Sequence, residues 1–258
     1  MRAYVQEVKQ QDPIYLGVVQ AALWFEQRGY EVIRFEFEEI SQGRLDNDLL
    51  HHPDETVVRG GVETIRQALL RAGRPLPPNI DLPTSLSPWI GRRFWKTTMG
   101  EVRAAVDAED FAPIHIKPLI HHKLFSGMVV RAFRDLISTA GVPSELPVLA
   151  QEYVDFISEW RAAILRDRIL KIGHYRGDPL AFPDAQAVKS AVPAFTDRPI
   201  AFAMDWGVTS SGQTLLVEVN DGFSLGNYGL SGSQYTALIE ARWRQLMGLQ
   251  DNRVGESP

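Results

Sequence analysis

The sequence predicts a mixed α/β (α+β) fold, and three observations support that prediction. Strand-like and helix-like patterns alternate through the first 73 residues, an order that favours a small α/β layer. Residues 75–88 then contain five prolines and show no helical or strand periodicity. Farther along, residues 160–175 and 204–220 each hold two runs of strand-forming residues joined by a short turn, which is typical of β-hairpins.

The alternating order near the N-terminus follows from hydrophobic periodicity. Apolar residues recur at helical spacing in residues 17–28, whereas Ile33, Phe35 and Phe37 alternate with other residues as they do in a strand. Gly60-Gly61 is interpreted as a turn before a helix rather than as a phosphate-binding loop. Strands are expected at residues 2–8, 31–37 and 56–59, and helices at 17–28 and 62–73.

Residues 75–88 are predicted to form an extended connector. The prolines at positions 75, 77, 78, 83 and 88 lack a backbone donor and fix the φ angle. We place the domain boundary here, which gives an N-terminal α/β region of residues 1–88 and a second domain of residues 89–258.

Composition excludes several classes of protein and of site. With 27 basic and 32 acidic residues the net charge is −5, so no broad attraction to nucleic acid is expected. The lack of cysteine excludes disulfides and thiolate metal sites. Neither a signal peptide nor an apolar run of about 20 residues, the length of a membrane span, is visible. We therefore expect a cytoplasmic protein that does not bind a membrane.

The second domain contains further predicted elements. A short strand at residues 113–118 ends in a lysine followed by proline, and a hairpin turns around Asp167-Arg168. Helices are expected at residues 184–192 and 235–247. For the basic and aromatic residues 92–96, three interpretations stay open: an exposed start of a helix, a contact with nucleic acid, or a phosphate-binding cation.

The residues from Met204 to Tyr228 contain the strongest candidate site. Glu218 and Asn220 are two apart on a predicted strand, so their side chains leave the same face about 7 Å apart. Asp205 lies on the preceding arm of the hairpin and can fold back beside them. Two carboxylates and an amide oxygen form the all-oxygen set that holds Mg²⁺, which takes its other ligands from water and substrate phosphates. The alternative is a half-exposed hairpin whose acids face water.

This hairpin resembles the metal-binding hairpin of the ATP-grasp superfamily. Lys117 and the residues Gln-Glu-Tyr-Val at 151–154 stand where other motifs of that superfamily occur. The run Val-Asn-Asp-Gly-Phe-Ser-Leu-Gly-Asn-Tyr-Gly-Leu at 219–230 resembles a subgroup named for one arginine and two lysines at its nucleotide site. The resemblance covers about residues 90–250. It implies an ATP-grasp fold, in which two α+β lobes grip a nucleotide, preceded here by a small Rossmann-like α/β region.

The resemblance also implies which residues contact the nucleotide. Lys117 would reach the phosphates, and Lys96 or Arg93 would be the first phosphate-binding cation. Residues 121–127 would form a loop that covers the phosphates. The hinge between the lobes would bind the base and the sugar, and its implied residues are Gln151, Glu152, Tyr153 and Val154 for adenine and Glu159 for the ribose.

Two arginines on the predicted second hairpin complete the implied set. Arg161 alternates with the apolar Ala162 and Ile164, so it points away from them and would be the arginine of the subgroup. Arg176 would meet the γ-phosphate or an acyl phosphate. For both arginines, an unpaired surface side chain is the alternative.

The reaction implied by the resemblance is the ATP- and Mg²⁺-dependent activation of a carboxylate as an acylphosphate, which an amine or related nucleophile then attacks. The polar side chains of Asp221, Ser224 and Asn227 would face the acceptor. The acceptor stays open between a small molecule, a peptide and a protein terminus. A kinase that phosphorylates a small molecule is one alternative, and a nucleotide- or peptide-binding module without turnover is the other.

Overall fold

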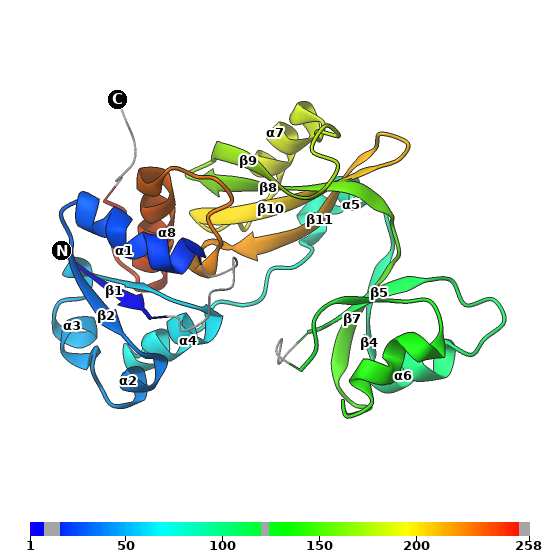
Figure 1. Ribbon diagram of the computed structural model, residues 1–258, viewed down its shortest axis with the longest axis horizontal. Helices are drawn as coiled ribbons and strands as arrows, with labels where there is room; N and C mark the ends of the chain where they lie inside the picture. The colour runs from blue at the N-terminus through cyan, green and yellow to red at the C-terminus, as the bar shows by residue number, and fades with distance from the viewer. Residues whose placement is uncertain (8–15, 120–123, 253–258) are drawn as a thin grey trace.

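The computed structural model describes residues 1–7, 16–119 and 124–252. Its described part contains three sheets, one parallel and two antiparallel, with helices packed against them. Figure 1 shows three bodies: an N-terminal α/β body on the left, a long twisted sheet above, and a smaller lobe on the right. Within the described part, no helix is both long and apolar enough to cross a bilayer.

The N-terminal body is built on three parallel strands. The strand β1 (Arg2–Gln6) lies between β2 (Glu31–Phe35) and β3 (Thr56–Arg59). Parallel neighbours need a crossover connection, which α1 (Leu16–Gln27) provides between β1 and β2. The predicted helix after Gly60-Gly61 is α4 (Val62–Arg71). The short helices α2 (Phe37–Ser41) and α3 (Asp46–His51) and the 3₁₀ turn η2 (Pro53–Glu55) were not predicted, because segments this short carry little periodicity.

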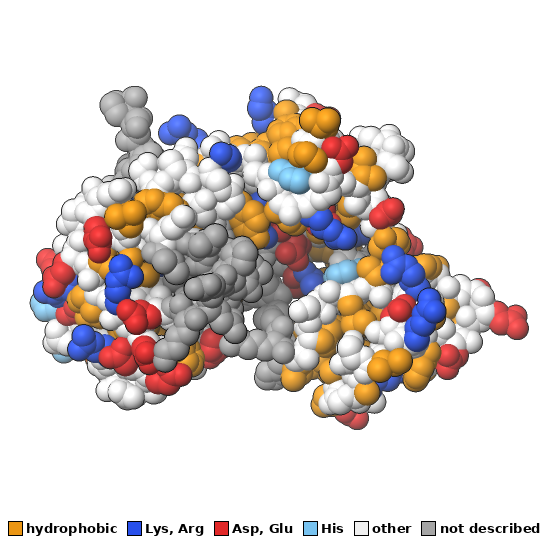
Figure 2. Space-filling view, viewed as in Figure 1, with side chains coloured by type: hydrophobic (Ala, Val, Ile, Leu, Met, Phe, Trp, Pro, Cys, Tyr) orange, Lys and Arg blue, Asp and Glu red, His pale blue; other side chains and the backbone are white. Residues whose placement is uncertain are grey.

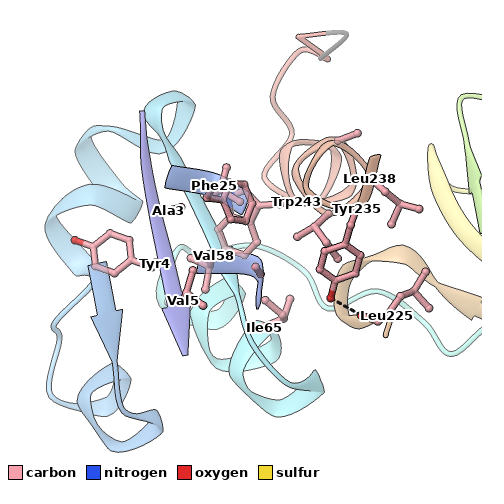
Figure 3. Packing of buried hydrophobic residues seen from close by; sticks show 14 of the residues in the cluster. Ala3, Tyr4, Val5, Phe25, Val58, Ile65, Leu225, Tyr235, Leu238 and Trp243 are labelled. Carbon is pink, nitrogen blue, oxygen red and sulfur yellow. Dashed lines mark hydrogen bonds between the residues drawn. The ribbon is translucent and has the colours of Figure 1, made fainter. Parts of the chain in front are cut away.

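The last helix of the chain packs on the N-terminal body. Helix α8 (Gly232–Leu246) shares one core with β1, β3 and α1, and Figure 3 shows Phe25, Val58 and Trp243 gathered where they meet. The indole N–H of Trp243 donates to the Thr56 carbonyl at 2.8 Å, and the hydroxyl of Tyr235 donates to the Leu225 carbonyl at 2.8 Å. The boundary between residues 88 and 89 stays a prediction, but β1 and α8, from the two predicted domains, lie in a common core.

The long sheet, which we call the hairpin sheet, has the strand order β11-β10-β8-β9 and is antiparallel throughout. Its strands are β8 (Phe156–Leu165), β9 (Arg168–Gly177), β10 (Ala201–Thr209) and β11 (Thr214–Asp221). The turn between β8 and β9 is Arg166-Asp167, one residue earlier than predicted. Both residues have positive φ angles, 49° and 66°, as a two-residue hairpin turn of this kind requires. Helices α5 (Ser87–Ile90) and α7 (Ala185–Ala194) supply residues to the core on one face.

The lobe sheet has the order β4-β7-β5-β6. Its strands are β4 (Phe94–Thr98), β5 (Ile114–Pro118), β6 (Met128–Val130) and β7 (Pro147–Glu152), and α6 (Met99–Ala105) and the 3₁₀ segment η4 (Phe133–Thr139) pack against it. The interpretation of residues 92–96 as the start of a helix was wrong. Phe94, Trp95 and Thr97 favour a strand, and the helix begins only after Thr98, whose hydroxyl accepts from the Glu101 N–H.

The proline-rich connector runs along the edge strand β11. Residues 74–80 contain no helix or strand, and the single residue Asp81, whose φ angle is +49°, bridges to Val219. The connector then departs from the prediction by forming a 3₁₀ turn at η3 (Thr84–Leu86) that leads into α5. Leu82 and Leu86 are buried in the same core as β10 and β11, so the connector is anchored to the hairpin sheet.

Two neighbouring leucines of α4 test the common core. Leu69 is fully buried and Leu70 is 53% exposed. We expect Leu69→Ala to lower the free energy of unfolding by about 2–5 kcal/mol, since it removes buried methyl groups and leaves a cavity. The matched variant Leu70→Ala should change it by about 0.5 kcal/mol or less. Urea unfolding followed by circular dichroism measures both, and equal losses would contradict the packing described here.

Candidate functional site

Three oxygen-bearing side chains meet on neighbouring strands of the hairpin sheet. Asp205 on β10 lies directly opposite Glu218 on β11, and Asn220 is two residues farther along β11. The side-chain amide nitrogen of Asn220 lies 3.1 Å from Asp205 Oδ2 and 3.0 Å from Glu218 Oε1. The hairpin therefore brings the two carboxylates and the amide to one point.

The carboxylate of Asp205 is buried and paired with an arginine from the next strand. Asp205 is 2% exposed, and Arg161 on β8 donates to both of its oxygens, at 2.7 and 2.6 Å. Burial raises the pKa of the Asp205 carboxyl, and the bonds from Arg161 oppose that rise. The guanidinium also lies 4.4 Å from the ring centroid of Tyr228, a residue with a positive φ angle of 45°. Arg161 thus does not have the unpaired surface position that was its alternative.

The second carboxylate is paired with a lysine from the other lobe. Lys117 Nζ lies 2.9 Å from Glu218 Oε2 and also contacts the carboxylate of Asp81. Burial opposes the charged ammonium, but Glu218 and then Asp81 outweigh it, so the pKa of Lys117 is raised. Burial likewise opposes ionisation of Glu218, but Lys117 and the amide of Asn220 lower its pKa to about 2. Both groups are charged at neutral pH.

Lys96 lies on the same face of the lobe sheet as Lys117. Both lysines are cross-strand neighbours of Leu149, one on each side of β7, so their side chains leave the sheet in the same direction. Strand spacing separates their backbones by about 10 Å. Lys96 is exposed, whereas Lys117 is largely buried.

A cavity of about 420 Å³ lies between the lobe sheet and the hairpin sheet. Predicted site residues line it: Glu152, Tyr153 and Val154 of the predicted hinge, Glu159 and Arg176 of the hairpin sheet, and Glu218. Glu218 forms a cluster with Asp205 and Asn220, which we call the acid cluster. Figure 2 shows acidic and basic side chains side by side in the hollow between the upper body and the right-hand lobe. The volume is in the range that suits a small-molecule ligand.

The hinge residues are held by neighbours at the rim of this cavity. Gln151 is buried, and its amide contacts Arg92 and His115 at 2.8 and 3.0 Å. Glu152 pairs with Arg93 at 3.1 Å, and the Tyr153 N–H donates to the Pro113 carbonyl at 3.2 Å. Across the described ranges, no residue hydrogen-bonds the backbone N–H or C=O of Val154. The cavity rim therefore presents one free backbone donor and one free acceptor.

The carboxylate of Glu159 is already bonded within the hairpin sheet. It accepts from the Tyr175 hydroxyl at 2.8 Å and from Arg176 at 2.6 Å. The Arg176 side chain lies at the cavity wall and is 72% exposed, and this ion pair holds its guanidinium. The structure therefore brings Arg176 to the residue predicted for the ribose rather than to the acid cluster.

The polar side chains at the end of β11 and in the loop after it are bonded within the protein. Asp221 pairs with Arg242 of α8 through two bonds of 2.6 and 2.5 Å, and the Ser224 hydroxyl donates to the Gly60 carbonyl at 2.9 Å. The side chain of Asn227 bonds the backbone of Leu230 and Gly229. Each of the three side chains helps to fix the loop, which includes the 3₁₀ turn η5 (Gly222–Ser224), and the expectation that they face an acceptor stays a prediction. Of the predicted phosphate-covering loop, residues 121–123 lie outside the described residues.

Sequence reasoning missed several residues of the site. Asp81 lies in the connector, where no pattern marks it. Arg92 is bonded both to Gln151 of the lobe and to the Leu216 and Val217 carbonyls of β11, and burial lowers its pKa to about 10. In the sequence Arg92 stands near the aromatic Phe94 and Trp95, which suggested a cluster on the surface. The structure shows instead that Arg92 bonds both the lobe sheet and the hairpin sheet.

The chemistry of the donor set fits Mg²⁺. Asp205 and Glu218 each have free lone pairs besides those used by Arg161 and Lys117, and turning the amide of Asn220 presents its oxygen to the same point. Among the described residues, no three His, Cys, Asp or Glu side chains gather as a metal site. The set of two carboxylates and one amide therefore fits a cation that takes further ligands from phosphates and water, as Mg²⁺ does.

A comparison with protein families agrees with this geometry. Residues 89–238, more than half of the chain, match the family described as "ATP-grasp domain, R2K clade family 2". The chain belongs to the ATP-grasp superfamily. The resemblance found in the sequence is thus confirmed at the level of the superfamily. A search of curated proteins found no match to this ATP-grasp chain.

Solved structures show the same fold. D-cycloserine synthetase DcsG is 12% identical with a TM-score of 0.59 over 95% of this chain and 99% of its own. L-amino acid ligase from Bacillus licheniformis is 10% identical with a TM-score of 0.58 over 100% of this chain and 78% of its own. D-alanine–D-alanine ligase from Bacillus anthracis, complexed with ATP, is 15% identical with a TM-score of 0.56 over 95% and 97%. These likenesses concern the fold, and they confirm the predicted ATP-grasp fold.

The half-buried His115 of this ATP-grasp protein should make its stability depend on pH. Burial and then the charge of Lys117 lower the pKa of His115 from 6.5 to about 4. Between these values the unfolded chain binds a proton that the folded chain does not, so stability is full above pH 6.5 and falls by at most about 3 kcal/mol as the pH drops to 4.

Urea unfolding at several pH values checks this dependence. We expect His115→Gln to flatten the decline in the free energy of unfolding between pH 6.5 and 4. His52 is exposed, so the matched variant His52→Gln should keep the decline of the wild type. A His115→Gln protein with the wild-type slope would contradict the assignment.

Proposed function

We propose that this protein is an ATP- and Mg²⁺-dependent ligase that joins a carboxylate to an amine through an acylphosphate. One observation carries the proposal: the cavity that starts at the hinge, at Glu152–Val154, reaches Glu218, where Asp205, Asn220 and the ammonium of Lys117 meet. A metal–nucleotide complex needs a hinge that binds its base. It also needs a cluster of acids and a lysine that bind its metal and its phosphates.

The hinge would bind the adenine. The free backbone N–H and C=O of Val154 offer the donor and acceptor that a purine edge pairs with, and the apolar Val129 and Val217 line the same cavity. Glu159 lies on the cavity wall between the hinge and the acid cluster, so its carboxylate would accept from the ribose hydroxyls. Because Tyr175 and Arg176 bond this carboxylate, they would hold it in place for the sugar.

The acid cluster would hold the metal. Asp205, Glu218 and Asn220 would supply three oxygen ligands, and a bound Mg²⁺ would neutralise part of the phosphate charge. Arg161 opposes the rise in the pKa of the buried Asp205 carboxyl and fixes the orientation of this carboxylate through two bonds, so we assign it the role of positioning this ligand. A role of Arg176 at the γ-phosphate stays a prediction.

Lys117 would contact the phosphates directly. Its ammonium already sits between the lobe sheet and the carboxylate of Glu218, and Lys96 lies on the same sheet face one strand beyond β7. These two cations would offset the charge on the transferred phosphoryl group, which needs positioning and neutralisation more than covalent chemistry.

The proposed reaction has two steps. A carboxylate oxygen of the acceptor attacks the γ-phosphorus, a P–O bond forms, and ADP leaves. The amine nitrogen then attacks the acyl carbon, the C–N bond forms, the C–O bond to phosphate breaks, and the nitrogen loses a proton. The product is an amide, and ADP and phosphate are released. The acceptors are a carboxylate and an amine borne by a small molecule, a peptide or a protein terminus.

Nucleotide-dependent thermal stabilisation tests the metal and nucleotide assignments. ATP with Mg²⁺ at about 100 times its dissociation constant should stabilise the protein by about 2.7 kcal/mol, and ATP with EDTA should stabilise it less. We expect Glu218→Ala to lose the Mg²⁺-dependent part because a metal ligand is gone. The matched variant Glu109→Ala removes an exposed carboxylate of the lobe and should keep the whole response. An unchanged ATP·Mg²⁺ response in Glu218→Ala would refute the metal assignment.

ADP release with a panel of amino acids and peptides tests the reaction. A ligase should release ADP and phosphate in equal amounts only when a carboxylate acceptor and an amine are both present. Release with a single acceptor and accumulation of a phosphorylated product would identify a kinase instead. Absence of release with every acceptor pair, despite ATP·Mg²⁺ binding, would indicate a binding module without turnover.

A further inference from the structure

Asp81 is held in an unusual conformation beside the proposed phosphate site. It lies in the connector, outside the matched residues 89–238. Its φ angle is +49°, in the left-handed region that few residues other than glycine, asparagine and aspartate adopt readily. Its carbonyl accepts from the Val219 N–H at 2.7 Å, and the buried Leu82 anchors the next position in the core. The backbone thus fixes where the carboxylate points.

That carboxylate contacts the lysine that we assign to the phosphates. Asp81 Oδ1 pairs with Lys117 Nζ, and its other oxygen accepts from Asn79. The two partners are 17% and 14% exposed, so solvent screens the pair weakly. Glu218 takes a second position on the same ammonium, at 2.9 Å. An ammonium has three N–H donors, and two of them therefore face carboxylates.

This arrangement sets a condition on any phosphate that approaches Lys117. Two carboxylates already contact the one ammonium, so a further anion must compete with both of them for it. A divalent cation bound by Glu218 would remove one of the two carboxylates from this balance. Asp81 is not part of the proposed metal set, and it would remain as the anion that competes with phosphate for Lys117.

We propose that Asp81 is a positioning residue that keeps Lys117 occupied until a metal-bound nucleotide enters, and so makes nucleotide binding depend on Mg²⁺. The inference rests on the proposed function, since it takes Lys117 as a phosphate ligand and Glu218 as a metal ligand. It adds that a carboxylate from the connector makes the cleft discriminate between free nucleotide and its magnesium complex.

The test compares dissociation constants of AMP-PNP, a non-hydrolysable ATP analogue, in EDTA and in Mg²⁺ by isothermal titration calorimetry. Asp81→Asn keeps the size of the side chain and a residue type that tolerates the left-handed conformation, but it removes the charge. We expect it to tighten binding in EDTA by roughly tenfold, because two unit charges about 5 Å apart still repel appreciably at an effective dielectric constant between 20 and 80. Binding in Mg²⁺ should change less than threefold.

The controls separate this inference from the proposed function. Asp81→Gly suits the positive φ angle and removes the whole side chain, and it should shift the ratio of the two dissociation constants in the same direction. Asp107→Asn removes an exposed charge of the lobe and should leave the ratio unchanged. Equal weakening with and without Mg²⁺ in both Asp81 variants would mean a purely structural role and overturn the inference alone. A wild-type protein that binds no AMP-PNP under either condition would overturn the proposed function as well.

Discussion

The constraint on which this site depends is the cost of placing carboxylates away from water. Asp205 and Glu218 face each other across the strand pair β10 and β11, and Asp205 is almost fully buried. A buried charge without a partner is strongly unfavourable, so each acid requires a cation close by. Arg161 provides it from the next strand, and Lys117 provides it from a different lobe. The same balance that makes the acids tolerable in the fold leaves their remaining lone pairs available to a divalent cation.

Because one of these partners comes from the other lobe, the charge balance also defines the cleft. Lys117 joins the lobe sheet to the hairpin sheet at one end, and Arg92 joins them near the hinge through Gln151 and the backbone of β11. Arg92 and Glu218, the partner of Lys117, both line the cavity in which we place the nucleotide. A metal-bound nucleotide can form its own ion pairs with Lys117 and with the acids, in place of the ion pairs within the protein. Binding of the nucleotide should therefore alter the contact between the lobes.

Much of the fold followed from the sequence, because its signals are local. The alternation around β2, the hairpin that carries Asp205 and Glu218, and the final amphipathic helix are each set by residues close in the chain. The residues that complete the site are not. The pairing of Arg161 with Asp205 depends on β8 lying beside β10, and Asp81 reaches Lys117 only because the connector is pinned to β11. No periodicity marks such contacts, and the short strand β4 was misjudged because aromatic and basic residues also begin helices.

A measurement of metal binding tests whether Asp205, Glu218 and Asn220 form a metal site. Electron paramagnetic resonance of Mn²⁺, which can replace Mg²⁺ at oxygen sites, reports the free ion in the presence of ADP and protein. We expect wild-type protein with ADP to remove free Mn²⁺ from solution, and Glu218→Gln and Asn220→Ala to leave markedly more of it free. Equal Mn²⁺ binding by wild type and both variants would contradict the claim that these side chains form the metal site.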